Sequence, residues 1–336
     1  MAQSGKVTST ELSPLNFQPP QTEKEGQGRS SEHNRRETAP MPPDTQTATT
    51  PIEHLERALV QKLEQGELEL PLLPQVASQV MALASDPAAD APKLSSLIHQ
   101  DQALAAHVLR IANSPAYMPR SPVVSLQHAV AMLGINLLSE IAFTASLKAG
   151  AFQVPGHEDE VKHLWRHSLA SGAFAKEVAR TRRVNVESAF LCGLLHGIGK
   201  PVVLRTTTTI ARELKIDWVK ALGTILDNKS HLMTLVEGYH TRMGTLIAGK
   251  WSLPKQVTEA IQYYGDYDHA TSFRQECMLT CVADRLATHL LTPDDMPEET
   301  LRDHPVFAEL NLYPNDIDQL VACRDKVLAV VNAMNL

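Results

Sequence analysis

Residues 191–200 read Leu191-Cys192-Gly193-Leu194-Leu195-His196-Gly197-Ile198-Gly199-Lys200. The stretch is apolar, contains three glycines and carries one histidine near its middle. A glycine inside a helix costs about 1 kcal/mol relative to alanine, so three of them indicate close backbone packing or a break in the helix near His196. We therefore expect helix over about 186–204, with His196 where the backbones approach most closely or where the helix breaks.

The rest of the chain favours the same kind of structure. Hydrophobic residues make up 43% of the 336 residues but aromatic residues only 5%, which is typical of helical packing rather than of a β-sandwich. Apolar residues recur at helical spacing, and no run of alternating β-branched residues is long enough to predict a strand. The predicted fold is all-α.

The periodicity also predicts where the helices lie. Asp101 and Ser125 are expected N-caps, and Gly66 and Gly134 are expected at helix ends. Residues 158–181 are predicted to form a central helix, because the small residues in its middle let neighbouring helices approach closely. The other expected helices cover about 51–65, 76–83, 91–99, 102–113, 125–133, 136–148, 217–228, 231–251, 254–264, 275–291 and 316–335.

The first 50 residues differ from the rest. They are rich in Gln, Ser, Thr, Glu and Pro and have few large apolar side chains, so they cannot bury enough surface to offset their ordering entropy. We predict a disordered tail. It serves either as a passive leader or as an arm that binds a partner or is phosphorylated.

The net charge, the cysteines and the apolar segments indicate which partners and which cell compartment to expect. The formal net charge is −7, so the basic stripe of a nucleic-acid-binding protein is not expected. The four cysteines show no zinc-binding spacing and are interpreted as reduced thiols in helices. No secretory signal follows Met1, and residues 129–147 are interrupted by polar residues, so a membrane span is not expected. We predict a cytoplasmic protein.

A specific resemblance appears when the motifs are taken in order. They are Leu70 to Pro74, Ile98-His99-Gln100-Asp101, Leu109 to Ser114, Tyr117, Ser125 to Val130, Leu133-Gly134, Leu164 to Ser168, the His196 stretch, and His240 up to Trp251-Ser252-Leu253-Pro254. This series, over roughly 65–290, resembles the HDOD domain, a branch of the HD superfamily found in bacterial signalling proteins. The resemblance implies an HD-type helical bundle at 51–291, preceded by the tail at 1–50 and followed by a helical extension at 292–336.

The resemblance also implies positions for metal ligands, because HD hydrolases hold one or two divalent ions with histidines and carboxylates. His167, His196, His240 and Asp284 match ligand positions of the superfamily. Three positions depart from the pattern. Gly197 stands where the aspartate of the His-Asp pair is expected, and Tyr263-Tyr264 stands where two-metal hydrolases often have two histidines.

These departures leave the site open to two interpretations. Three histidines and one aspartate would satisfy a single tetrahedral zinc ion. Alternatively, His196 is a core histidine kept from a metal-binding ancestor, and no metal is held. Lys200 and Arg166 are candidate contacts for an anion, although a solvated lysine near a helix end is the simpler interpretation of Lys200.

The functional expectation follows from the incomplete set of metal ligands. We expect a non-catalytic bacterial signalling module with no cofactor, which binds protein partners in a signalling pathway. A first alternative is a metal-dependent phosphohydrolase or cyclic-nucleotide phosphodiesterase that uses His167, His196, His240 and Asp284 with a residual divalent metal. A second alternative is a receptor for a small nucleotide second messenger, with Lys200 and Arg166 at the anion.

Overall fold

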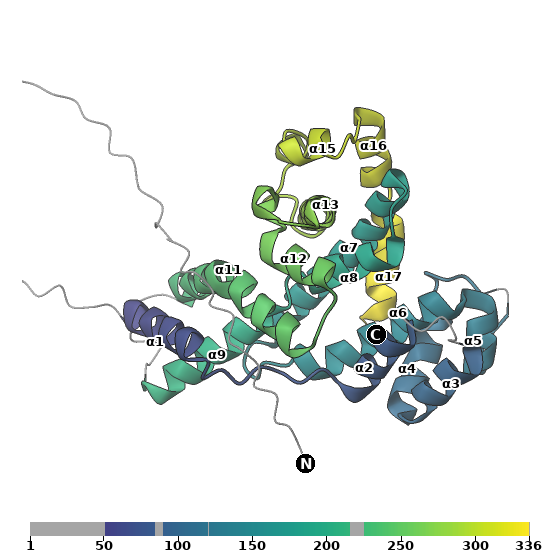
Figure 1. Cartoon of the computed structure of the whole chain (residues 1–336), viewed down its shortest axis with the longest axis horizontal. Coiled ribbons are helices and arrows are strands. Elements are labelled where there is room, and N and C mark those ends of the chain that lie inside the picture. Colours follow the sequence, from purple (N-terminus) through teal and green to yellow (C-terminus); the bar gives the residue numbers. More distant parts are fainter. Residues whose placement is uncertain (1–50, 85–89, 120, 216–224, 336) are drawn as a thin grey trace, which may run out of the picture. The chain divides into compact units, whose positions relative to one another are not determined.

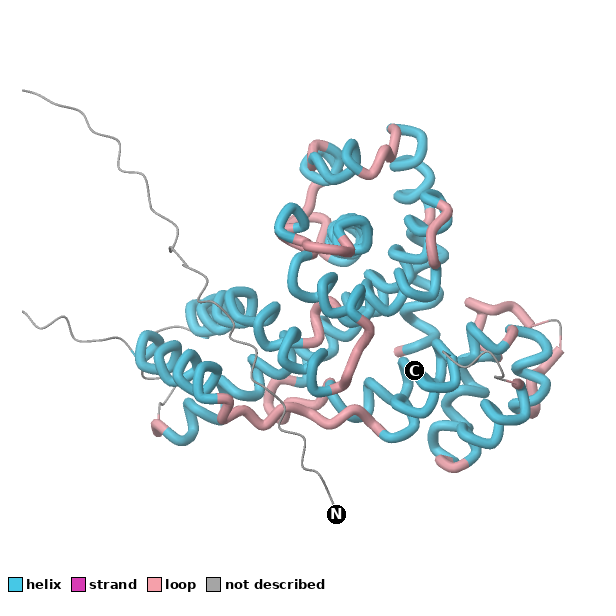
Figure 2. The backbone as a smooth tube through the Cα atoms, in the orientation of Figure 1, coloured by secondary structure: helices cyan, strands magenta, loops and turns pink. Residues whose placement is uncertain are grey.

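The computed structural model describes residues 51–84, 90–119, 121–215 and 225–335. All regular elements in these ranges are helices, and no strand occurs among them, which confirms the all-α prediction (Figures 1 and 2). The predicted tail at 1–50 and residues 217–224 of the predicted helix at 217–228 lie outside the described residues.

A first group of helices precedes the His196 stretch. Asp101 accepts a hydrogen bond from the backbone N–H of Leu104 at 3.0 Å, and Ser125 accepts one from His128 at 3.1 Å, so both are N-caps as predicted. Gly134, with φ +81°, separates the last two helices. The group comprises α2 (Gln75–Ala84), α3 (Ala91–His99), α4 (Gln102–Ala112), α5 (Leu126–Leu133) and α6 (Ile135–Ala151), which pack on one another.

The apolar window at 129–147 divides between α5 and α6 in this group, and most of its side chains are buried against other helices. Among the described residues, no helix combines the length and the apolar character that crossing a bilayer requires.

The helices that position the site follow. They are α7 (Glu158–Arg182), α8 (Val186–Leu195), α9 (Gly199–Glu213), α11 (Ile225–Lys250), α12 (Lys255–Tyr263) and α13 (Arg274–Leu291). Helix α7 packs against α8 and α13, while α11 packs against α9 and α12. Helix α1 (Pro51–Gln65) lies on α9 and α11 and ends at Gly66, with φ +68°.

The contact between α7 and α8 explains the small residues of both helices. A Cβ atom at Gly193 would lie 2.6 Å from the backbone oxygen of Ser171 and 2.8 Å from the Cβ of Ala175. The two helices therefore touch at a distance that only glycine permits. The expected helix over 186–204 is broken between Leu195 and Gly199, so both close packing and a break account for the glycines.

The C-terminal residues pack on the same helices. After the short η1 (Tyr267–His269) and α13 come α14 (Glu298–Arg302), α15 (Pro305–Glu309), α16 (Pro314–Ala322) and α17 (Arg324–Met334). Helices α14 and α15 contact α13, whereas α16 and α17 contact α7. The Lys148 ammonium of α6 donates to the backbone oxygen of Asn335 at 3.0 Å. A division between 51–291 and 292–336 stays a prediction.

The single helix predicted over 316–335 is wrong. Cys323 lies between α16 and α17, and its backbone N–H bonds to the carbonyl of Leu320, three residues back. This tighter turn ends α16, and α17 begins at the next residue. For the same reason Cys323 is not inside a helix, unlike the other three cysteines. All four thiols are free, and Cys192, Cys277 and Cys281 are buried.

Candidate metal site

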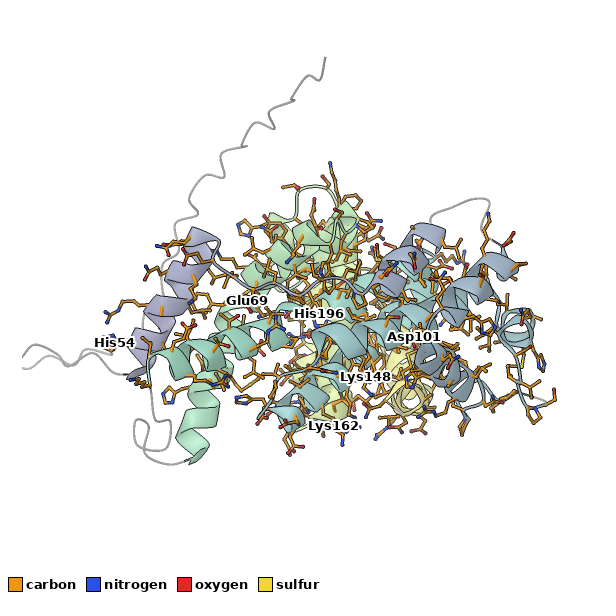
Figure 3. All side chains as sticks on the ribbon, turned by 90° about the horizontal axis from the view of Figure 1, so that it is seen from below. His54, Glu69, Asp101, Lys148, Lys162 and His196 are labelled. Atoms are coloured by element: carbon orange, nitrogen blue, oxygen red, sulfur yellow. The ribbon has the colours of Figure 1, made fainter. Side chains whose placement is uncertain are left out.

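The break between α8 and α9 places His196 in the interior. His196 is the residue that follows α8, and its side chain is completely buried, whereas His54 on α1 is exposed (Figure 3). The next helix starts against α11, because a Cβ atom at Gly199 would lie only 1.9 Å from the backbone oxygen of His240. Gly199 thus lets the backbone of His240 approach the His196 turn.

Three of the four predicted ligands come together. His167 from α7, His196 and Asp284 from α13 each offer a donor atom, and these atoms all lie within 4.8 Å of one another. His196 Nε2 lies 3.1 Å and His167 Nε2 lies 3.6 Å from the same Asp284 oxygen, Oδ1. The side chain of Asp284 is 23% exposed and that of His167 16%, so the group is not fully buried.

The hydrogen bonds of His196 leave one of its nitrogens available. Its Nδ1 lies 2.7 Å from the backbone oxygen of Gly193, which can only accept, so Nδ1 carries a proton. In the neutral ring the lone pair is then on Nε2, which points at the carboxylate of Asp284. A lone pair facing a carboxylate needs a cation or a proton between them. The donor set of two imidazoles and a carboxylate therefore fits one divalent ion.

His240 is not part of this group among the described residues. Its Nδ1 lies 2.8 Å from the backbone oxygen of Glu237 and donates to it, while its Nε2 lies 3.0 Å from the hydroxyl of Tyr264. Tyr264 follows α12 and stands between the two histidines. Its ring centroid is 4.7 Å from that of His196, at 72° to it, and 6.0 Å from that of His240.

The pKa shifts agree with this arrangement. Burial, reinforced by the Lys200 charge, lowers the pKa of His240 to about 4, and burial lowers that of His167 to about 3 despite the attraction of Asp284. Burial also raises the pKa of the Tyr264 phenol well above its usual value. Burial would raise the pKa of Asp284, but protonation of His196 and His167 in acid, together with the charge of Lys200, holds it below its usual value. At neutral pH, His167 and His240 are uncharged, Tyr264 is protonated and Asp284 is ionised.

Gly197 leaves space at the position where the resemblance to HD hydrolases predicts an aspartate. A Cβ atom there would meet nothing closer than the Cδ of Lys200 at 3.8 Å and would lie 4.0 Å from the Oγ of Ser168. Lys200 covers this space with its methylene groups and donates to Glu237 Oε1 at 2.8 Å. Arg166, the other predicted anion contact, is half-buried on α7 and has no hydrogen bond or ion pair within the described part of the chain.

Sequence reasoning missed two residues of the site. In the sequence, Tyr264 stands only where a histidine is expected, and nothing there indicates that its ring fills the site. Thr288 was not considered, although it lies one helical turn after Asp284 on α13. Its hydroxyl donates to the Asp284 carbonyl oxygen at 2.9 Å and lies 3.1 Å from His167 Nε2, so it contacts the ring nitrogen that an ion would need. Helical spacing from Asp284 was the signal for Thr288.

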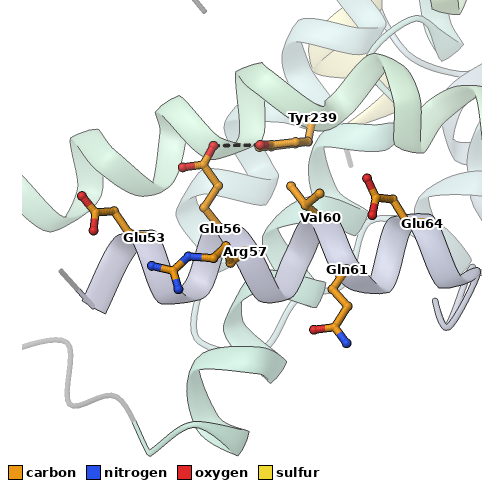
Figure 4. A pocket seen from close by; sticks show the side chains of 7 residues that line it. All are labelled: Glu53, Glu56, Arg57, Val60, Gln61, Glu64 and Tyr239. Carbon is orange, nitrogen blue, oxygen red and sulfur yellow. Dashed lines mark hydrogen bonds between the residues drawn. The ribbon is translucent and has the colours of Figure 1, made fainter. Parts of the chain in front are cut away.

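A separate groove of about 640 Å³ lies elsewhere, between α1 and α11 (Figure 4). Glutamates Glu53, Glu56 and Glu64 line it together with Arg57 and Tyr239, and the hydroxyl of Tyr239 donates to Glu56 at 2.7 Å. None of the three clustered metal donors lines this groove.

Comparison with known proteins places the chain in a family. The profile of the HDOD domain matches residues 70–267, more than half of the 336 residues. The chain belongs to the HDOD family. The match includes His167, His196 and His240 but ends before Asp284, which the fold brings to the site.

Individual relatives support the fold. A crystal structure of a "Putative metal-dependent phosphohydrolase" from Shewanella amazonensis SB2B has a TM-score of 0.64 at 22% identity, over 84% of this chain and 99% of that one. A "Putative signal transduction protein" from Marinobacter aquaeolei VT8 has a TM-score of 0.59 at 22% identity, over 87% of this chain and 69% of that one. An uncharacterized protein of Treponema pallidum (strain Nichols) is 26% identical over 211 residues, 60% of this chain and 39% of that protein. The chain thus spans well under half the length of this curated relative.

Proposed function

We propose that this HDOD protein is a non-catalytic signalling module that acts by binding protein partners and whose candidate metal site holds one divalent ion at most. The observation that carries the proposal is the composition of the donor group. Among the described residues, this group consists of His167, His196 and Asp284. Two-metal hydrolysis needs a second ion about 3.5–4 Å from the first, with ligands of its own. The residues that would supply them are altered.

Gly197 and Tyr264 are the two alterations, and each leaves a second ion without one of its ligands. Gly197 offers no oxygen to bridge two ions, and the space beside it is covered by the methylenes of Lys200. His240 is a suitable metal ligand, but its Nε2 is hydrogen-bonded to the hydroxyl of Tyr264. An ion in the remaining group would supply Lewis-acid character and lower the pKa of a bound water. Around it, His196 and Asp284 would hold the ion, and Thr288 would contact His167.

The signalling part of the proposal rests on family membership and on one relative described as a signal transduction protein. The buried thiols Cys192, Cys277 and Cys281 suit a reducing compartment, so we place the protein in the cytoplasm. The partner is a protein of a signalling pathway, since the HD core then serves as a scaffold rather than as a catalyst.

The test is turnover measured together with metal content. The purified chain is loaded with Mn²⁺, Fe²⁺ or Zn²⁺ in turn, dialysed, analysed for metal and assayed with bis-(p-nitrophenyl) phosphate and with cyclic mono- and dinucleotides. We expect no more than one ion per chain and no hydrolysis above that of the free metal. Hydrolysis that a folded His196→Gln variant abolishes would overturn the proposal.

One observation favours a second function. His196 Nε2 lies 3.1 Å from Asp284, close enough for both to bind one ion, which suits a one-metal phosphohydrolase. The same assay separates the two functions, because the second requires metal-dependent turnover. A nucleotide receptor is separated by a melting shift on adding a cyclic nucleotide, which would be lost in Lys200→Ala and Arg166→Ala.

A further inference from the structure

Tyr264 has a more specific position than a lost histidine requires. It follows directly after α12 and is half-buried, and its neighbour Tyr263 points elsewhere, with its hydroxyl accepting from the side chain of Gln262 at 3.0 Å. Only Tyr264 contacts histidines among these two tyrosines. Its ring is edge-on to His196 and its hydroxyl reaches His240.

The direction of the hydrogen bond to His240 follows from geometry. The carbonyl oxygen of Glu237 can only accept, so His240 Nδ1 donates to it at 2.8 Å. In the neutral ring the lone pair is on Nε2, and the phenol of Tyr264 donates to that lone pair at 3.0 Å. An ion bound by this nitrogen would have to displace the phenol hydroxyl.

We propose that Tyr264 is an internal occupant of the candidate metal site, where its hydroxyl takes the lone pair of His240 and its ring takes the space beside His196, and that it so limits this chain to one ion. The inference rests on the proposed function and names the residue that sets the capacity of its site. A phenol in this place does what a second ion would do: it satisfies His240 and fills the volume between two imidazoles. It does so without adding charge.

The alternative role for Tyr264 is that of a ligand, since a phenolate oxygen can bind a metal. Tyr264→Phe distinguishes the two roles, because it removes the hydroxyl and keeps the ring. An occupant that is not a ligand can lose its hydroxyl without loss of the ion held by His167, His196 and Asp284.

The experiment measures zinc retained per full-length chain after loading and dialysis. We expect Tyr264→Phe to retain zinc within about twofold of the unmodified chain. We expect Tyr264→His to retain one ion more per chain than the unmodified protein, and His240→Gln in that background to remove the gain. Tyr263→His is the matched control, which adds a histidine one residue away and should add no bound ion.

Three results would overturn the inference. They are a loss of retained zinc of more than tenfold in Tyr264→Phe, an absent gain in Tyr264→His, or a gain that His240→Gln leaves unchanged. Because each result is a difference between variants, it is independent of whether the unmodified chain hydrolyses phosphoesters, which alone decides the proposed function.

A second readout covers the case in which Tyr264→His does not fold. In ¹⁵N NMR of imidazole-labelled protein, loss of the phenol donor in Tyr264→Phe should move the His240 Nε2 resonance downfield, toward that of a free lone pair. His196 Nε2 should move much less, since its partner is Asp284. An unchanged His240 resonance in Tyr264→Phe would show that the phenol does not hold this nitrogen and would refute the inference.

Discussion

His196 and His240 both contact Tyr264 and differ in the group that faces Nε2 of each ring. In both, Nδ1 donates to the backbone oxygen three residues earlier, at 2.7 Å to Gly193 and at 2.8 Å to Glu237. In its neutral form, each ring therefore presents a lone pair on Nε2. In His196 the lone pair faces the carboxylate of Asp284, whereas in His240 it faces the hydroxyl of Tyr264.

This comparison shows that the group facing Nε2 decides whether each histidine is available to a metal ion. A lone pair opposite a carboxylate makes a place for a cation, while a lone pair opposite a phenol is already satisfied. The two glycines of the same turn differ in a similar way. A side chain at Gly197 would find space, but one at Gly199 would collide with the backbone of His240.

The largest expected effect comes from disrupting the close contact between Gly199 and the backbone of His240. In Gly199→Ala the new Cβ would lie 1.9 Å from the His240 backbone oxygen and 2.7 Å from the Gly244 backbone nitrogen, so α9 and α11 must separate. We expect a loss of unfolding free energy of about 3 kcal/mol or more. Gly197→Ala, two residues away, should lose less than about 1 kcal/mol. Urea denaturation of both variants checks the difference, and equal losses would contradict it.

The next effect is on metal affinity and tests the two histidines directly. Four ligands of a zinc ion together supply roughly 10–16 kcal/mol, so one ligand is worth about 3 kcal/mol, or on the order of 100-fold in affinity. We expect His196→Gln to weaken zinc binding on that order. His240→Gln should change it by less than about threefold, since Tyr264 holds that nitrogen. Competition with a chromophoric chelator measures both, and equal losses would mean that both histidines bind the ion.

The sequence predicted the fold better than it predicted the site. Caps such as Asp101 and Ser125 are local, since each bonds a backbone N–H three residues on, and both were predicted correctly. The break at 316–335 was missed because it depends on one backbone hydrogen bond of Cys323, which leaves no mark in the apolar periodicity.

For the site, motif matching chose His167, His196 and Asp284, which the fold brings together from three segments. It also chose His240, but the contact that separates His240 from the others comes from Tyr264. Such a contact between α11 and the end of α12 is long-range, and the spacing of residues does not reveal which side chain occupies a shared volume.

The third effect is on the pH dependence of stability, measured without metal. Burial lowers the pKa of His240 from its usual 6.5 to about 4. The unfolded chain therefore takes up this proton first, so stability is fully present above pH 6.5 and is lost as pH falls toward 4. Removing the group in His240→Gln should reduce the loss between pH 7 and pH 5 by about 2 kcal/mol. Urea titrations at both pH values test this, and parallel losses in the two proteins would contradict it. Asp284 titrates in a separate, more acidic window.

The smallest expected effect is a gain in zinc affinity from an added carboxylate next to His196. Gly197→Asp places a carboxylate where a Cβ has room, since the nearest atom is 3.8 Å away. The added carboxylate would follow His196 in the chain and lie near Lys200, but a buried carboxylate also loses hydration, so only part of its attraction for an ion remains. We expect zinc affinity to rise about tenfold, or about 1.4 kcal/mol. Gly197→Asn is the matched control, with the same shape and no charge, and should gain little. The gain in Gly197→Asp should persist in His240→Gln, because the carboxylate acts next to His196. Dependence of the gain on His240 would mean that the two histidines share the ion.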